Sequence, residues 1–215
     1  MNRHRDIGSA ALLATLAASL MSAHQVAAKA TREALFLSSF HSRSLPLLMM
    51  GAALLAIVLA LFVSRAMAAV GPGRLVPAAF ATSAAFHFAE WALASHFPRL
   101  IAVAFYLHFA SLGAIAISGF WSLLSERFDP HTARQRIAQI TSGGAAGALA
   151  GGGVAMAVGR EFGAAAMLPL LACLHVVCAW MLGTLRRSGD EQPSDSTVPA
   201  QNRALRENAV DAPDC

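Results

Sequence analysis

The chain has 215 residues, of which 56% are hydrophobic and only 13% are charged, and its formal net charge is +4. A soluble domain carries roughly 25% charged residues, and one core of this size cannot bury so many apolar helices. The composition therefore excludes an ordinary soluble domain and predicts a lipid bilayer as the partner. The basic residues are spread between apolar runs instead of forming a patch with aromatic residues, so no nucleic-acid partner is expected.

Six apolar stretches of helical length follow one another along the chain. Each is close to the ~20 residues that cross a bilayer as a helix, and none shows the period of two that marks barrel strands. They lie at residues 8–28, 45–67, 75–97, 100–124, 137–158 and 163–185. The predicted fold class is an all-α membrane protein, a bundle of six transmembrane helices.

This pattern divides the chain into three parts. Residues 1–8 form a short N-terminal segment, residues 9–185 form the six-helix transmembrane domain, and residues 186–215 are polar and contain prolines, so they are expected to be a disordered tail. The longest loop between helices is predicted at residues 125–136. Within it, Asp129 and Pro130 are typical of an N-cap and the first position of the next helix.

The arginines near the ends of the apolar stretches predict the orientation in the membrane. If the N-terminus is inside, nine lie on the inner side and three on the outer side, which favours both termini in the cytoplasm. The inner set is Arg3, Arg5, Arg65, Arg74, Arg127, Arg134, Arg136, Arg186 and Arg187, and the outer set is Arg43, Arg99 and Arg160. The predicted location is the bacterial inner membrane, as a multi-pass protein.

A signal peptide is the alternative interpretation of the N-terminus. Arg3 and Arg5 precede an apolar run that ends in small residues around positions 23–30, which is the pattern of a cleaved leader. Cleavage would leave five membrane spans and place the new N-terminus outside.

Polar residues at the outer end of the first helix are candidates for binding an anion. Lys29 is the only lysine of the chain, and Gln25 and Arg32 lie four and three residues away, on the same stripe of the helix. A charge in the hydrocarbon region is costly, so such a stripe normally faces a water-filled cavity. In the alternative interpretation, Lys29 and Arg32 extend their charged ends to the outer membrane surface.

Glu90 in the third predicted helix and His108 in the fourth are ionisable residues within apolar runs. His87, Trp91 and Ser83 share the face of Glu90. Because Lys29, Glu90 and His108 all fall in the outer half of the bilayer, an ion pair between Glu90 and Lys29 or Arg32 is allowed. This group is either part of a substrate pathway or a polar contact that holds helices together. The predicted substrate-binding residues are Gln25, Lys29, Arg32, Glu90 and His108.

Metal binding and enzyme activity are not expected from the sequence. His87 and Glu90 are close enough on one helix to share a metal ion, but the next candidate ligand, His96, lies more than two turns away. The chain also has no serine–histidine nucleophile pattern and no paired aspartates. We therefore predict no metal site, no cofactor and no enzyme.

The fifth predicted helix carries two stripes of small residues. Gly143, Gly147, Gly151, Ala155 and Gly159 recur every four residues, and a second stripe follows beside them at Gly144, Ala148 and Gly152. Small residues allow two helix backbones to approach closely in lipid, whereas glycine alone lowers helix stability. A close partner is therefore predicted for this helix, either within the chain or on a second protein.

Part of the sequence resembles a known transporter family. Three features carry the resemblance: the segment from Phe120 to Ser122, the segment from Phe128 to Arg136 with the glycines that follow, and the segment from Lys29 to Leu37. They are similar to stretches of the nucleotide translocases, which exchange ATP for ADP and belong to the major facilitator group. The resemblance covers roughly residues 23–185.

The resemblance implies a fold and a partner. Members of the family have about twelve spans in two six-helix halves, with the substrate between them, so this chain is expected to be similar to the first half alone. It implies that basic residues of the first helix, here Lys29 and Arg32, bind an anionic substrate. It also implies that the fifth helix with its glycines faces the other half, so its partner is expected to lie outside this chain.

Two functions are expected from these observations. The first is a half-size transporter that pairs with a second copy or a separate second half and moves a nucleotide or another small organic anion. The alternative is a membrane scaffold or regulatory module that transports nothing and dimerises through its fifth helix.

Overall fold

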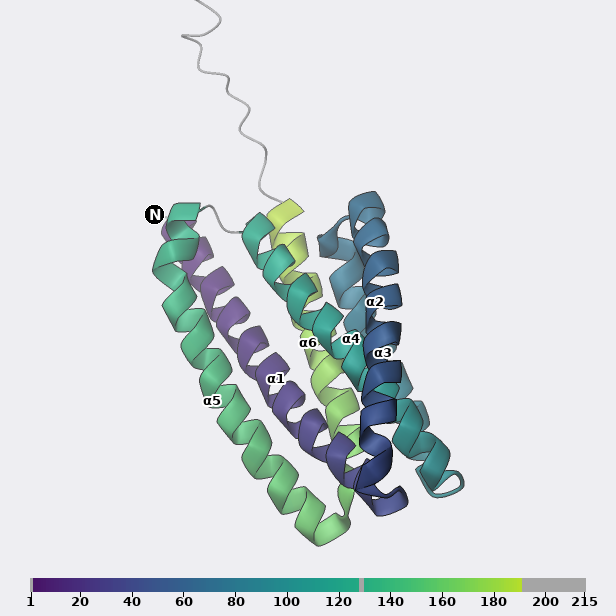
Figure 1. Cartoon of the computed structure of the whole chain (residues 1–215). Helices are drawn as coiled ribbons and strands as arrows, with labels where there is room; N and C mark the ends of the chain where they lie inside the picture. The colour runs from purple at the N-terminus through teal and green to yellow at the C-terminus, as the bar shows by residue number, and fades with distance from the viewer. Residues whose placement is uncertain (1, 128–129, 191–215) are drawn as a thin grey trace, which may run out of the picture.

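The computed structural model describes residues 2–127 and 130–190, which form six α-helices running alongside one another in one bundle (Figure 1). Short 3₁₀ turns at Ser42–Ser44 and Ala164–Ala166 precede the second and last helices. The helices are α1 (Asn2–Ser39), α2 (Leu45–Val70), α3 (Pro72–Ala94), α4 (Pro98–Arg127), α5 (Pro130–Phe162) and α6 (Met167–Asp190). The prediction of an all-α protein is confirmed, and the expected tail from residue 191 onward lies outside the described residues.

The helices extend beyond the apolar stretches. Helix α1 continues past residue 28 to Ser39, so Lys29 and Arg32 lie on it as predicted, and α5 begins at Pro130, the predicted first position of its helix. Asp129, the predicted N-cap, lies outside the described residues. The long loop predicted at residues 125–136 is therefore wrong, because most of it is helical. The physical reason is that Arg, Gln, Glu and Lys are good helix formers, so hydrophobicity marks the membrane-crossing part of a helix and not its ends.

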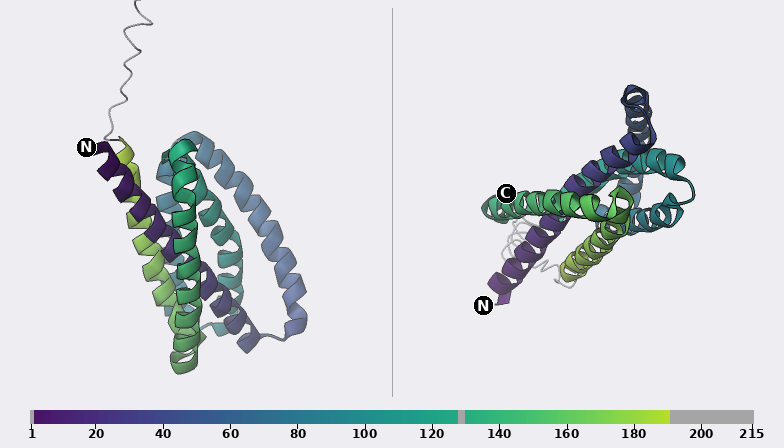
Figure 2. Two further views of the ribbon diagram at one scale, coloured as in Figure 1. Left: turned by 90° about the vertical axis from the view of Figure 1, so that its left-hand side faces the viewer. Right: turned by 90° about the horizontal axis from the view of Figure 1, so that it is seen from below.

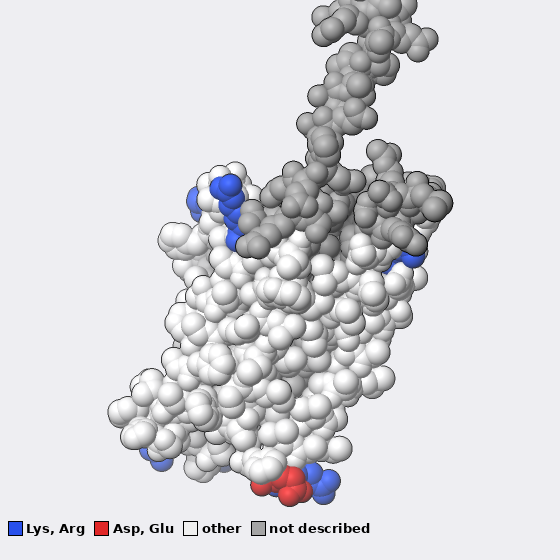
Figure 3. All heavy atoms as spheres, turned by 180° about the vertical axis from the view of Figure 1, so that it is seen from behind, with Lys and Arg blue, Asp and Glu red and all other residues white. Residues whose placement is uncertain are grey.

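Four helical stretches within the described residues are long and apolar enough to cross a membrane. They are Ala11–Ser39, Ser42–Val70, Pro98–Ser125 and Ala164–Thr184. In the view of Figure 3, the charged side chains that are drawn lie at the two ends of the bundle, and the broad face between them carries none. The chain is therefore a membrane protein. Neither α3 nor α5 is among the four, so the crossing of these two helices stays a prediction.

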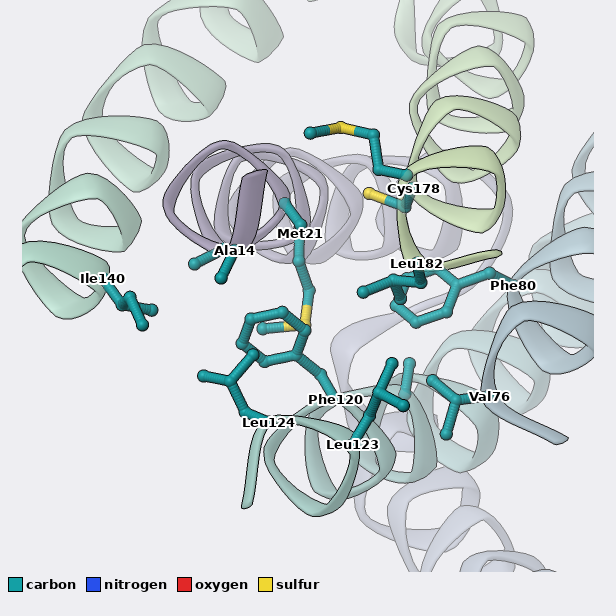
Figure 4. Close-up of a cluster of buried hydrophobic side chains, with 14 of the residues drawn as sticks. Ala14, Met21, Val76, Phe80, Phe120, Leu123, Leu124, Ile140, Cys178 and Leu182 are labelled. Carbon is teal, nitrogen blue, oxygen red and sulfur yellow. The ribbon is translucent and has the colours of Figure 1, made fainter. Parts of the chain in front are cut away.

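Helix α1 runs through the middle of the bundle, and α2 lies at its edge (Figure 2). Helix α5 covers one side of α1, while α4 and α6 pack on other sides of it and α3 packs between them. Figure 4 shows side chains from five of these helices meeting in one apolar cluster, with Met21 and Phe120 at its centre. Helix α2 leaves apolar side chains such as Leu54 and Phe62 exposed, 66% and 68% respectively, as expected for a surface that faces lipid.

The glycine stripe of α5 packs against α1 of the same chain. A Cβ atom added at Gly147 would lie 2.0 Å from the carbonyl oxygen of Ser19, and one at Gly151 would lie 2.2 Å from that of Ala23. A Cβ at Gly143 would lie 2.5 Å from the side-chain methyl group of Thr15, whereas Gly159 faces open space. The expectation that α5 awaits a partner outside this chain is therefore wrong, because α1 already occupies the stripe.

Candidate functional site

Four histidines, one glutamate and one serine meet inside the bundle, and we call them the histidine–glutamate cluster. The helices α1, α3, α4 and α6 contribute to it. Its members are His24, Ser83, His87, Glu90, His108 and His175. His108 is half-buried and the other five side chains are buried, with Glu90 6% exposed and His87 0% exposed. Four helices are thus joined by polar contacts in a part of the bundle that is otherwise apolar.

The cluster lies well inside the bundle. At 1.5 Å per residue, His175 is about 12 Å from the start of α6 and His108 about 15 Å from the start of α4. Glu90 is about 6 Å from the end of α3. These three helix ends lie at the end of the bundle opposite to the described chain ends (Figure 1).

Glu90 holds the cluster together by accepting two hydrogen bonds. Nδ1 of His87 lies 3.1 Å from Oε2 of Glu90, and Nδ1 of His108 lies 2.9 Å from Oε1. An ionised carboxylate only accepts hydrogen bonds, so both Nδ1 atoms are assigned a proton. In a neutral imidazole the second nitrogen is then an acceptor. The Nε2 atoms of His87 and His108 therefore carry lone pairs.

Two arms extend from this centre, and the same logic assigns their protons. In the first arm, Nε2 of His24 lies 3.0 Å from Nε2 of His87 and donates to it. In the second arm, Oγ of Ser83 lies 2.8 Å from Nε2 of His108 and donates to it. Nδ1 of His175 then donates to Oγ of Ser83 over 2.9 Å. Each tautomer is assigned from the hydrogen-bond network.

Both arms end in a ring nitrogen without a partner. Nδ1 of His24 and Nε2 of His175 are buried and have no hydrogen-bond partner among the described residues. The two rings are stacked, with centroids 3.5 Å apart and an interplanar angle of 22°. An unmet buried acceptor costs about 1–3 kcal/mol, and networks that serve only structure are normally satisfied. The cluster therefore has an unused capacity to bind a donor or a cation.

Aromatic side chains enclose the cluster. Phe80 contacts the ring of His175 edge-on with centroids 5.0 Å apart, and Phe105 lies 5.5 Å from the ring of His87. Phe86 packs against His108 at 5.3 Å. Such an apolar shell keeps water away and strengthens electrostatic interactions within it.

The structure brings together only part of the predicted substrate-binding set. Glu90 and His108 are in direct contact, as their predicted depth allows. Gln25 instead donates to the carbonyl oxygen of Gly113 over 3.1 Å, and Lys29 is exposed. Arg32 is paired with Glu33, and its guanidinium lies 4.3 Å from the centroid of the Tyr106 ring.

The ion pair considered between Glu90 and Lys29 or Arg32 is therefore not formed. Glu90 has histidines as its partners instead. The geometry explains the difference, since Arg32 lies two turns further along α1 than His24, the residue of α1 that reaches the cluster.

His24 and His175 were not among the predicted residues. Both are histidines within predicted apolar helices, so the signal that singled out Glu90 and His108, an ionisable group inside a membrane span, also applies to them. The sequence alone does not show that four helices bring these side chains together.

Two overlapping groups of side chains have the spacing of metal ligands. One ligand atom each of His24, His87 and His175 lie within 4.8 Å of one another, and the same holds for His87, Glu90 and His108. His96, the third ligand considered from the sequence, is exposed and contacts Ser95. The groups that could hold a metal thus come from separate helices.

The arrangement defines a helical membrane protein with a sealed site of imidazoles and one carboxylate. Comparison of the chain with protein-family models, with curated proteins and with solved structures finds no match.

Proposed function

We propose that this chain is a membrane transport protein that moves a cation by way of the histidine–glutamate cluster. One observation carries the proposal: a buried carboxylate meets three buried imidazoles and one half-buried imidazole, from four helices, within the bundle. Ionisable residues at membrane depth are costly and mark ion pathways and binding sites in transporters. Two ring nitrogens without partners show where binding capacity remains.

The chemistry of the cluster favours a cation over an organic anion. Its only acidic group is Glu90, and the free positions are nitrogen lone pairs, which repel an anion and attract a cation. The cationic side chains expected to bind an anion lie elsewhere: Lys29 is exposed and Arg32 is paired with Glu33. A nucleotide phosphate placed at the cluster would therefore meet a carboxylate and no positive charge.

The proposal includes six membrane crossings, with α3 and α5 crossing beside the four apolar helices. All six helices lie side by side along the bundle, and both described chain ends lie at one end of it (Figure 1). Both features support six crossings. An even number of crossings requires this position of the chain ends. The resemblance to half of a major facilitator fold is kept within the proposal: alternating access then needs a second six-helix unit, from a second copy or a separate chain.

The scaffold alternative receives less support from the packing of α5. It needs a surface of α5 that is free for a second protein. Gly147 and Gly151 are in contact with the backbone of α1.

Flux measurements in proteoliposomes test the proposal. Vesicles loaded with a zinc-sensitive or a pH-sensitive dye should report entry of a cation in the presence of the protein and not in its absence. Glu90→Gln removes the charge at the centre of the cluster and should reduce the flux to the level of protein-free vesicles. Glu161→Gln, at the exposed end of α5, is the matched control and should leave it unchanged. Absence of zinc and proton flux in the wild type, or equal flux in both variants, would contradict the proposal.

A further inference from the structure

We infer that His24, His87 and His175 bind a divalent transition-metal ion of the zinc type. The inference rests on the proposed function, because it names the cation that the cluster would carry. It depends on three observations: the spacing of the ring nitrogens, the position of their protons and the two nitrogens without partners.

The spacing suits three imidazole ligands around one ion. One ring nitrogen of each histidine lies within 4.8 Å of the others, and those of His24 and His87 are already 3.0 Å apart. Zinc–nitrogen bonds of about 2.0–2.1 Å in tetrahedral geometry place the nitrogens about 3.3 Å from one another. The ligands come from α1, α3 and α6, and the stacked rings of His24 and His175 have to tilt apart so that a lone pair of each points at the ion.

Two of the three ligands carry the required lone pair in their assigned tautomers, and the third, His24, has to move its proton. Nδ1 of His87 donates to Glu90 and Nδ1 of His175 donates to Ser83, so Nε2 of each ring is unprotonated. His24 carries its proton on Nε2, which faces Nε2 of His87, so this proton has to move to the unpartnered Nδ1 before Nε2 of both rings can bind the ion. Neutral imidazole is a good ligand for zinc, copper and nickel.

Glu90 and Ser83 then occupy the position of outer-shell partners. Metal-binding histidines usually donate their second ring N–H to a carboxylate or another oxygen, which fixes the tautomer and the ring orientation. His87 and His175 already have these hydrogen bonds, to Glu90 and to Ser83. His24 contributes a ring stacked on His175 instead.

The second group, His87, Glu90 and His108, is less suited to bind the ion directly. The two Nδ1 atoms that face the carboxylate donate protons to it, so they offer no lone pair. The expectation of no metal site considered only His87, Glu90 and His96 along the sequence. In the structure, the other two candidate ligands beside His87 are His24 from α1 and His175 from α6.

Zinc binding by the purified full chain tests the inference. The protein is prepared in detergent with an affinity tag free of histidine, stripped with a chelator and dialysed against zinc alone. We expect a single tightly bound zinc ion per chain. His24→Gln and His175→Gln should each weaken binding by more than about 100-fold, at least the loss that outer-shell changes can cause. His96→Gln is the matched control, because His96 is exposed and lies outside the cluster.

Two further readouts keep the test independent of how well the variants fold. Zinc should raise the unfolding temperature of the wild type, since a ligand that binds only the folded state stabilises it. Cobalt in place of zinc should give the intense visible absorption of a four-coordinate site. No bound zinc in the wild type, or equal binding by His175→Gln and His96→Gln, would overturn the inference.

Failure of the site and failure of the transport proposal are distinguishable. Zinc binding that depends on His24 and His175, without flux in vesicles, would uphold the metal site and reject transport. Proton flux that depends on Glu90, without zinc binding, would uphold transport and reject the metal site.

Discussion

Glu90 determines where the protons lie in the whole histidine–glutamate cluster. Because its two oxygens accept from His87 and His108, each neighbour further along the arms can have only one tautomer. The lone pairs therefore appear at the far ends, on His24 and His175, about as far from the carboxylate as the cluster extends. A single acidic residue thus fixes the tautomers of all four histidines and leaves one lone pair without a partner among the described residues on each of the two outer rings.

The tautomers can be measured directly. In protein labelled with ¹⁵N-histidine, we expect His87, His108 and His175 to carry the proton on Nδ1, and His24 to carry it on Nε2. Nitrogen chemical shifts distinguish the two forms, and single-histidine substitutions assign the signals. A proton on Nε2 of His87 would contradict the arrangement, because Glu90 would then have lost one of its two donors.

At the level of the helices, α5 holds α1 in place through backbone contact. Gly147 and Gly151 allow the two backbones to touch, and the residue after Ala23 in this contact is His24. Close packing of α5 on α1 therefore helps to fix the position of His24, which forms the first arm of the cluster. Lipid offers no hydrophobic drive between helices, so this close contact is a main source of their association.

Two glycine substitutions separate packing from helix propensity. Gly147→Ala places a Cβ against the carbonyl oxygen of Ser19 and should lower the free energy of unfolding by about 1–3 kcal/mol, the usual cost of overpacking. Gly153→Ala lies on the same helix and meets nothing within 4 Å. It should stabilise the protein by up to about 1 kcal/mol, because alanine is the better helix former. Thermal unfolding in detergent gives both values, and an equal response would show that α1 and α5 are not in contact there.

The sequence predicts these elements well in their apolar parts and poorly elsewhere. Hydrophobicity locates all six helices, but it does not mark their polar ends: α1 continues to Ser39, and residues 134–136 lie within α5 although they were expected in a loop. The four-residue period of the glycines predicts a close partner without naming it. Only the three-dimensional packing shows that the partner is α1.

The candidate site could also be predicted only in part from the sequence. An ionisable residue in an apolar run is visible in the sequence, which is how Glu90 and His108 were found. Which of these residues meet is decided by the relative rotation and depth of four helices, and that is not encoded in the spacing along any one of them. His24 and His175 lie 151 positions apart in the chain, yet their rings are stacked.

For the molecule as a whole, the number of crossings is the main structural question. Within the part of the chain that the structure describes, four helices have the apolarity to cross a membrane. Helix α3 carries Glu90 and α5 carries the glycine stripe. Both features contact other helices of the bundle. Shielding by α1, α4 and α6 is what would allow α3 to cross with a carboxylate.

Accessibility of single cysteines distinguishes six crossings from four. In a variant without Cys173, Cys178 and Cys215, Arg74→Cys lies near the start of α3 and His96→Cys just after its end, both at exposed positions. With six crossings and both termini inside, a membrane-impermeant maleimide should label His96→Cys in intact cells. Arg74→Cys should react only after permeabilisation. Protection of both positions in intact cells would place the two ends of α3 on the inner side and reject the proposed topology.

The measurement that decides most about this protein is cation flux into proteoliposomes, compared between Glu90→Gln and Glu161→Gln. Both variants exchange a carboxylate for an amide of the same shape, one inside the sealed cluster and one at the exposed end of α5. If the cluster is the transport site, Glu161→Gln retains the wild-type flux and Glu90→Gln loses it. Wild-type flux in Glu90→Gln vesicles would show that cations cross without the cluster, and the proposed function would have to be abandoned.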